Sequence, residues 1–300
     1  MPSLRSHALV AFLRITRRKH IYSSVGAVLE GITKVRQAGP GRPSSEMSRR
    51  VKVEHQTVDG IEIYRISPHI PQPRQLNVFY LHGGAYIRPI TSHHWRFIQA
   101  LVEQAGCTII VPLYPLAPEA TCKGTVAAVT ALYKRACTEA GVASFDVIGD
   151  SAGGGMALAL CYALREDTAI LPRSLVLICP WLDVTLTNPS IAPNEKNDPM
   201  LASSGLKEAG RMYAGNLGSE HCYVSPIYGD LRGLPPTLLF AGTRDMAHYD
   251  ELLFAEKAKL AGVEVDLQVG QEMIHVWPIL PIPEGKKALR DIIRHFQTAL

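Results

Sequence analysis

The stretch Gly149-Asp150-Ser151-Ala152-Gly153-Gly154 joins an apolar run at residues 145–148 to a helix-like segment at residues 156–165. It has the form Gly-x-Ser-x-Gly, in which a sharp strand-to-helix turn exposes the serine hydroxyl at the edge of a sheet. The residues two before and two after such a serine approach each other closely, and glycine stands at both positions here. A glycine-rich turn with an idle serine is the alternative, but the strand, turn and helix context favours Ser151 as a nucleophile.

The rest of the chain alternates short apolar runs with helix-like segments. This order predicts an α/β protein with a central, mostly parallel sheet covered by helices on both faces. A hairpin signal at residues 51–66, with Asp59-Gly60 at its turn, predicts that the sheet begins antiparallel. The later strands are expected at residues 78–81, 108–111, 145–148, 175–178, 237–241 and 263–269. The helices are expected at residues 95–104, 126–139, 156–165, 249–261 and 286–298.

Two segments depart from this alternation. Residues 1–38 carry apolar side chains at helical spacing and end in a cluster of helix breakers. Residues 183–226 are rich in Pro, Asn, Ser and Gly, and they are too long for a bare connection. We expect a helix there at residues 204–213 and a position over the sheet, together with the N-terminal helices. The chain therefore divides into an N-terminal helical cap segment (1–45), a first part of the core (46–182), a cap insertion (183–226) and a second part of the core (227–300).

Composition excludes several classes of protein. With 47% apolar and 19% charged residues, the 300-residue chain is neither disordered nor collagen-like. Its longest apolar run covers residues 156–164, which is too short for a membrane span, so we expect no stable membrane insertion. The net charge of +4 is mild and its basic residues are scattered, which gives little support for nucleic-acid binding.

The cysteines and the N-terminus bear on location. The six cysteines include no Cys-x-x-Cys pair and several stand in apolar runs, which predicts buried free thiols and a cytoplasmic protein. Most basic residues follow the apolar stretch at residues 7–13, whereas in a secretory signal they precede it. We expect a helix packed on the rest of the protein with its basic face in water. A basic amphipathic helix lying on a membrane surface is the alternative.

A serine of ordinary pKa is a weak nucleophile and needs a base. That base should come from a loop at the same edge of the sheet. His275 follows the last expected strand, and Asp245 follows the strand before it. The order Ser151, Asp245, His275 predicts a triad in which the carboxylate orients the imidazole. Asp183, which follows the preceding strand, and Asp250 are the alternative acids.

A second glycine motif, His82-Gly83-Gly84-Ala85, follows the expected strand at residues 78–81. Glycines at the end of a strand leave backbone N–H groups free to bind a developing oxyanion. Together with the N–H of Ala152, they predict an oxyanion hole. We expect His82 to hold this loop by hydrogen bonds rather than to act as the base.

No motif calls for a cofactor or a metal. The chain has no phosphate-binding Walker loop and no dinucleotide fingerprint. His93-His94 has no carboxylate at ligand spacing and is more typical of a helix start. Tyr86 and Trp181 could line a substrate pocket, although each could equally belong to the core. We therefore predict no metal and no cofactor.

Together these motifs resemble the hormone-sensitive-lipase-like branch of the α/β-hydrolase esterases. The resemblance rests on residues 82–85, on Tyr114-Pro115-Leu116-Ala117-Pro118-Glu119, on residues 149–154, and on Gly242-Thr243-Arg244-Asp245 with His275. It implies the α/β-hydrolase fold, an eight-stranded sheet and a helical cap. It also implies that the oxyanion donors are Gly83, Gly84 and Ala152. Val276 takes the place of the glycine usual after the histidine.

The resemblance also implies a function. The expected activity is that of a serine carboxylesterase, which hydrolyses short-to-medium acyl esters through an acyl-enzyme intermediate. An amidase or a lactonase with the same triad is one alternative. A non-catalytic small-molecule receptor on a hydrolase scaffold is another, although such proteins have lost triad members. The expected partner is a small-molecule ester, and the last strand, near residues 263–269, could be an exposed edge that forms a homodimer.

Overall fold

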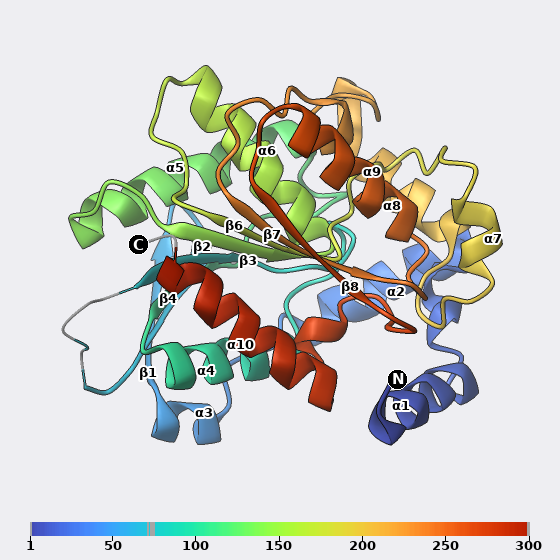
Figure 1. The fold of residues 1–300 in the computed structure, drawn as a ribbon, viewed down its shortest axis with the longest axis horizontal. Helices are drawn as coiled ribbons and strands as arrows, with labels where there is room; N and C mark the ends of the chain where they lie inside the picture. The colour runs from blue at the N-terminus through green and yellow to red at the C-terminus, as the bar shows by residue number, and fades with distance from the viewer. Residues whose placement is uncertain (1, 71, 73–75, 299–300) are drawn as a thin grey trace.

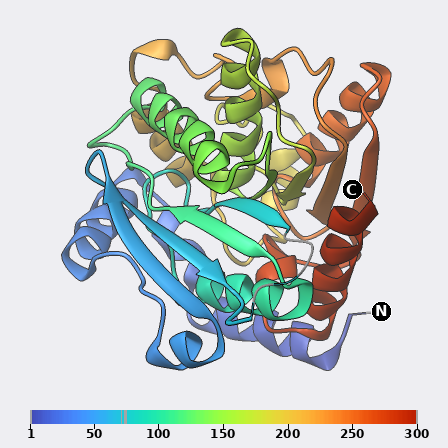
Figure 2. The ribbon, with the colours of Figure 1, turned by 90° about the vertical axis from the view of Figure 1, so that its left-hand side faces the viewer.

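The computed structural model describes residues 2–70, 72 and 76–298 and is built around an eight-stranded sheet. The strands are β1 (Lys52–Val58), β2 (Ile61–Ser67), β3 (Asn77–Leu81), β4 (Thr108–Pro112), β5 (Asp146–Asp150), β6 (Leu175–Ile178), β7 (Thr237–Gly242) and β8 (Val265–Gly270). Their order is β1-β2-β4-β3-β5-β6-β7-β8. β2 pairs antiparallel with β1 and β4, and all later pairs are parallel. The predicted mostly parallel sheet with an antiparallel start is confirmed, and Figure 2 shows the β1–β2 hairpin at one edge.

Helices cover both faces of this sheet (Figure 1). α5 (Cys122–Ala140), α6 (Ala152–Glu166) and α9 (His248–Leu260) lie on one face, and α3 (Ser45–Arg50), α4 (Ser92–Ala105) and α10 (Pro283–Thr298) lie on the other. The strands separate two apolar cores because successive side chains of a strand point to opposite faces. In β3, Phe79 and Leu81 pack in the core under α5 and α6, whereas Val78 and Tyr80 pack with α4 and α10.

The remaining α-helices gather at one end of the sheet, on the right of Figure 1. They are α1 (Leu4–Ile15), α2 (Val25–Ala38), α7 (Ile191–Glu195) and α8 (Ser203–Ala214). Short 3₁₀ turns are η1 (Arg18–Tyr22), η2 (Gly215–Leu217), η3 (Pro226–Tyr228) and η4 (Trp277–Ile279). η1 and α2 both pack against α8, where a Cβ atom at Gly205 would lie 2.5 Å from the Tyr22 carbonyl oxygen. The N-terminal segment therefore meets the 183–226 insertion directly.

The N-terminal helix packs on the core but also exposes apolar side chains. Ser6 Oγ of α1 donates to Glu284 Oε2 of α10 at 2.8 Å, which ties the first helix to the last one. Leu4, Phe12 and Ile15 nevertheless stay largely exposed. In the part of the chain that the structure describes, no helix combines the length and the apolar character that crossing a bilayer requires. All six cysteines are free thiols, and all but Cys222 are buried.

Candidate active site

Ser151 occupies a strained turn between β5 and α6. Its backbone has φ 53° and ψ −121°, a conformation that residues with side chains rarely adopt. The Ser151 N–H donates to the Ile178 carbonyl oxygen at 2.8 Å, which anchors the turn to β6. A Cβ atom at Gly149 would lie 2.2 Å from the Gly153 carbonyl oxygen, and one at Gly153 would lie 1.9 Å from the Leu81 carbonyl oxygen. The turn therefore requires glycine at both positions.

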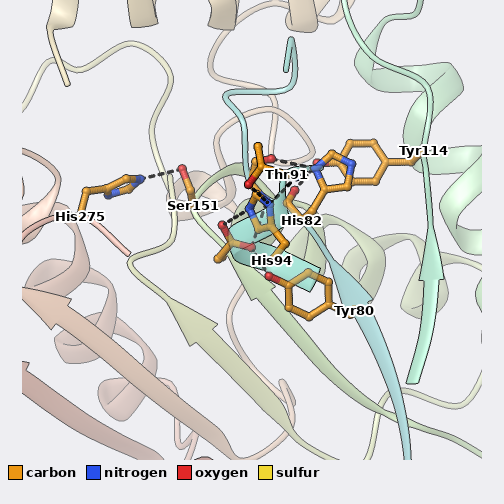
Figure 3. A network of polar contacts seen from close by, with 9 residues as sticks. Tyr80, His82, Thr91, His94, Tyr114, Ser151 and His275 are labelled. Atoms are coloured by element: carbon orange, nitrogen blue, oxygen red, sulfur yellow. Dashed lines mark hydrogen bonds and ion pairs between the residues drawn. The ribbon is translucent and has the colours of Figure 1, made fainter. Parts of the chain in front are cut away.

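Ser151, His275 and Asp245 meet beyond the carboxyl ends of β5, β8 and β7. His275 Nε2 lies 2.8 Å from Ser151 Oγ, and His275 Nδ1 lies 2.6 Å from Asp245 Oδ2. Figure 3 shows the contact between His275 and Ser151 as a dashed line. Asp245 is fully buried, and its Oδ1 accepts the Ala247 N–H at 2.9 Å. This second bond leaves Oδ2 directed at the imidazole. The chain of bonds can move a proton from the serine hydroxyl to the histidine.

The charges around His275 favour its protonated form. Burial opposes the charged imidazole, but the carboxylates of Asp245, Asp198 and Asp150 together outweigh burial and raise the pKa of His275 above its ordinary value. Asp198 Oδ2 accepts the Met246 N–H at 3.0 Å, and burial and Asp245 raise the pKa of Asp198 to about 6. Burial and Asp245 also raise the pKa of Glu251, whose carboxylate has no hydrogen-bond partner among the described residues. Sequence reasoning missed both of these buried acids, because neither belongs to a local motif.

The two alternative acids lie outside this chain of bonds. Asp183 accepts the Thr185 N–H at 2.8 Å and the Tyr228 hydroxyl at 3.1 Å. Asp250 accepts the Asn188 amide at 2.7 Å. Neither carboxylate makes a hydrogen bond to His275 in the described parts of the chain. Both acids instead hold the loop that follows β6.

One cluster near the triad has metal-ligating residue types. Cys179, Asp245 and His275 bring one ligand atom each to within 4.8 Å of one another. Burial raises the pKa of the Cys179 thiol well above its ordinary value. The other two residues are already hydrogen-bonded to each other. The cluster therefore fits a triad better than a metal centre.

The loop after β3 offers a different set of free N–H groups from the predicted one. The Gly83 N–H donates to Asp150 Oδ1 at 3.0 Å, so its one hydrogen is already bound to a carboxylate. The prediction that Gly83 is an oxyanion donor is therefore wrong. The N–H groups of Gly84, Ala85 and Ala152 have no acceptor among the described residues. Gly84 has φ 131° and Ala85 has φ 53°, which turns these two amides away from strand geometry.

Asp150 ties this loop to the serine turn. Besides the Gly83 amide, its Oδ1 accepts the Tyr80 hydroxyl at 2.6 Å, and its Oδ2 lies 3.3 Å from His94 Nε2. Burial opposes its ionisation, but these partners outweigh burial and lower the pKa of Asp150. His94 therefore has a partner carboxylate, although none stands at ligand spacing in the sequence. The acid lies 56 residues away in sequence, beyond the reach of a spacing rule.

His82 holds the same loop, as expected. Its Nδ1 donates to the Gly83 carbonyl oxygen at 2.7 Å, and its ring stacks on Tyr114 with the centroids 4.4 Å apart. Burial lowers the pKa of His82 to about 4. His82 therefore stays neutral at ordinary pH. Within the described chain, it makes no hydrogen bond to Ser151.

A cavity of about 140 Å³ lies in front of Ser151. Apolar side chains from η1, α8 and the loops between strands form much of its wall, namely Ile21, Leu186, Leu201, Leu206, Met246, Ile279 and Leu280. Trp181 lines the cavity, as predicted. Tyr86 does not line it. Its ring lies behind Trp181, 5.7 Å away between centroids, and stacks on Tyr213 at 3.6 Å, so Tyr86 belongs to the core.

Comparison with known proteins identifies the family. A family model described as the α/β-hydrolase fold matches residues 78–279. The chain belongs to the α/β-hydrolase family. It is 33% identical over 229 residues to a triacylglycerol lipase of Mycobacterium tuberculosis, with 76% of this chain and 47% of the lipase covered. This α/β hydrolase thus spans about half the length of that relative.

Two further similarities indicate the branch of the α/β-hydrolase family to which the protein belongs. An esterase of Acinetobacter venetianus is 33% identical over 232 residues, covering 74% of this chain and 75% of the esterase. A solved hormone-sensitive lipase from a metagenome library superposes with a TM-score of 0.85 at 25% identity, covering 100% of this chain and 99% of that one. The predicted resemblance to the hormone-sensitive-lipase-like branch is confirmed. The protein is an α/β hydrolase of the esterase and lipase type.

Proposed function

We propose that the protein is a serine carboxylesterase. The observation that carries this proposal is the unbroken chain of bonds from Ser151 Oγ through His275 to Asp245, at 2.8 Å and 2.6 Å. Ser151 attacks the ester carbonyl while His275 takes its proton, and the new imidazolium faces the Asp245 carboxylate. His275 then protonates the leaving alcohol, which leaves an acyl-enzyme. Water, activated by His275, releases the acid and restores the serine.

The developing oxyanion needs backbone donors that have no other acceptor. The N–H groups of Gly84, Ala85 and Ala152 meet this condition, so we propose them as the oxyanion hole in place of the predicted set with Gly83. The Asp150 carboxylate holds the Gly83 amide and thereby sets the position of the two amides that follow. Its role is to position the loop.

We also propose that residues 1–45 and 183–226 form a cap over the site. η1 and α8 belong to these two segments, pack on each other and supply apolar walls to the cavity. A cavity of about 140 Å³ with such walls suits a short-to-medium acyl chain. In p-nitrophenyl esters from acetate to decanoate, kcat/KM should therefore peak at a short or medium chain and fall toward decanoate.

The test of the proposed function is labelling by a fluorophosphonate, together with rapid mixing with p-nitrophenyl butyrate. We expect one label per chain, on the peptide that contains Ser151, and turnover of the ester that labelling abolishes. An unreactive Ser151 with no turnover of any ester in the series would favour the receptor alternative. Faster turnover of a matched anilide or lactone would favour the amidase or lactonase alternative.

Asp245→Asn is expected to lower kcat by about 10³- to 10⁴-fold, because the amide no longer stabilises the imidazolium and no longer selects the productive tautomer. Asp183→Asn is the matched control, since Asp183 is a buried acid in a neighbouring loop without a bond to His275. It should keep its kcat. Steady-state kinetics with p-nitrophenyl butyrate measures both, and an equal loss in the two variants would contradict the assignment of Asp245.

The pH dependence follows from His275. Only the neutral imidazole can take the Ser151 proton, and the pKa of His275 is raised, so kcat/KM should fall as pH drops through a midpoint above 6.5. In Asp245→Asn the carboxylate that most raises this pKa is gone, while burial, which lowers it, remains. The midpoint of the residual activity should therefore move to lower pH. A profile measured on both proteins that shows the same midpoint would contradict this account.

Assembly and location stay predictions. β8 ends the order of the sheet, so its outer edge has no partner strand among the described residues. We propose this edge as the contact of a homodimer, which size-exclusion chromatography would detect as a doubled mass. The free thiols are consistent with the predicted cytoplasmic location, which localisation of the tagged protein would test.

A further inference from the structure

Two arginines line the cavity in front of Ser151 without an acidic partner. Arg18 lies in η1, and Arg88 lies in the loop that follows β3. Neither guanidinium makes a hydrogen bond or an ion pair with any residue that the structure describes. Arg36 on the adjacent helix α2 behaves differently, because its guanidinium binds both carboxylate oxygens of Glu119. Unlike Arg36, the two cavity arginines therefore carry charges that no carboxylate of the described residues offsets.

Their positive charges are close enough to oppose each other. Partial burial and the charge of Arg88 both lower the pKa of Arg18. Asp150 is the one carboxylate among the described residues that line the cavity, and the oxyanion loop and His94 already occupy its oxygens. Like charges held together without a counter-ion cost free energy, and an anion placed between them would offset that cost.

A third polar group belongs to the same wall. Tyr22 of η1 lines the cavity, and its hydroxyl has no hydrogen-bond partner among the described residues. Burial raises the pKa of Tyr22, and the charges of Arg88 and Arg18 oppose that rise, as expected for a phenol near both guanidinium groups. A Cβ atom at Gly31 of α2 would lie 3.0 Å from Arg88 Nη1. The Arg88 guanidinium thus reaches toward the cap segment that carries Arg18 and Tyr22.

We propose that Arg18, Arg88 and Tyr22 bind a carboxylate group of the substrate, so that the enzyme prefers esters with a negatively charged acyl or alcohol part. This inference rests on the proposed function, because the ester bond must reach Ser151 while the carboxylate reaches the arginines. A guanidinium matches a carboxylate with parallel N–H donors, and a phenol hydroxyl adds one more. The apolar wall of the cavity, including Leu201, would hold the methylene groups between the two ends.

Matched pairs of esters test the substrate class. The acyl series is the mono-p-nitrophenyl esters of glutarate, adipate and pimelate, each compared with the same compound whose free carboxylate is masked as a methyl ester. The alcohol series compares 4-acetoxybenzoate with its methyl ester. After subtraction of the enzyme-free rate, kcat/KM should favour the carboxylate form by about tenfold or more in at least one pair, as charged hydrogen bonds would give. The preference should shrink as NaCl is added.

Variants then assign the preference to the two arginines. Arg88→Gln and Arg18→Gln should each reduce it by about tenfold while leaving kcat/KM for the neutral p-nitrophenyl butyrate close to wild type. Arg14→Gln is the matched control, because Arg14 is an exposed arginine of α1 that does not line the cavity. It should keep the full preference.

Two outcomes would overturn the inference and leave the esterase proposal standing. One is equal turnover of both members of every pair by an enzyme that hydrolyses p-nitrophenyl butyrate. The other is a loss in Arg88→Gln and Arg18→Gln that affects charged and neutral esters alike. Failure of the proposed function has a different signature, namely no turnover of p-nitrophenyl butyrate and no fluorophosphonate label at Ser151.

Discussion

Replacing Ser151 with alanine is expected to lower kcat for p-nitrophenyl butyrate by about 10⁵- to 10⁶-fold, as loss of the nucleophile does in serine triads. In the proposed mechanism, the hydroxyl is the group that bonds to the carbonyl carbon, and no acyl-enzyme forms without it. His275 and Asp245 remain in Ser151→Ala, but the base then has no proton to take. What survives is the residual effect of the oxyanion donors and of binding. Steady-state kinetics and fluorophosphonate labelling on the same preparation measure the loss.

The same variant separates chemistry from folding. Alanine keeps the Cβ atom at a turn whose φ of 53° is equally strained for both residues. Among the described residues, the one side-chain bond lost is that to His275 Nε2. The unfolding temperature of Ser151→Ala should therefore stay close to wild type. Ser23→Ala removes an exposed serine whose hydroxyl donates to the His20 carbonyl oxygen, and it should keep full activity. If Ser151→Ala retained a large share of the turnover, another residue would have to be the nucleophile.

The fold and the triad were predictable because their signals are local. The glycines around Ser151 report a close backbone approach within a few residues of sequence, and strand-terminal loops bring Asp245 and His275 to the same edge of a parallel sheet. Periodicity likewise placed every strand of the sheet. It could not show that residues 1–38 form two helices separated by the turn η1, because Arg17 adopts φ 50° without any glycine to signal it.

The remaining features depend on contacts between distant residues. Whether the Gly83 amide is free depends on Asp150, which is 67 residues away, and the partner of His94 is the same acid. The position of Asp150 directly before Ser151 is the one sequence feature that could indicate this role. The position of Tyr86 depends on Tyr213, which stacks on it from α8. No local pattern could indicate that Arg18 and Arg88 would meet across the cavity.

Gly153→Ala is expected to prevent folding or to destabilise the protein by more than about 3 kcal/mol, beyond the usual cost of overpacking a core. The added Cβ would lie 1.9 Å from the Leu81 carbonyl oxygen and 2.8 Å from the His82 carbonyl carbon. These are backbone atoms at the end of β3, which is held on both sides by β4 and β5. They cannot move aside as a flexible side chain would. Urea titration of the purified variant, or its recovery in the insoluble fraction, measures the effect.

Gly124→Ala provides the matched control, because Gly124 lies in α5 and a Cβ there would meet no described atom within 4 Å apart from the adjacent backbone of its own helix. It should be neutral or stabilise the protein by up to about 1 kcal/mol, as alanine favours helix over glycine. The comparison separates the steric effect of the added Cβ atom from helix propensity, because both substitutions raise the helix propensity of their segment. If Gly153→Ala had the same midpoint of urea unfolding as the wild type, α6 could not lie as close to β3 as the structure shows. The strained backbone of Ser151 would then need a cause other than the packing of that helix against the strand.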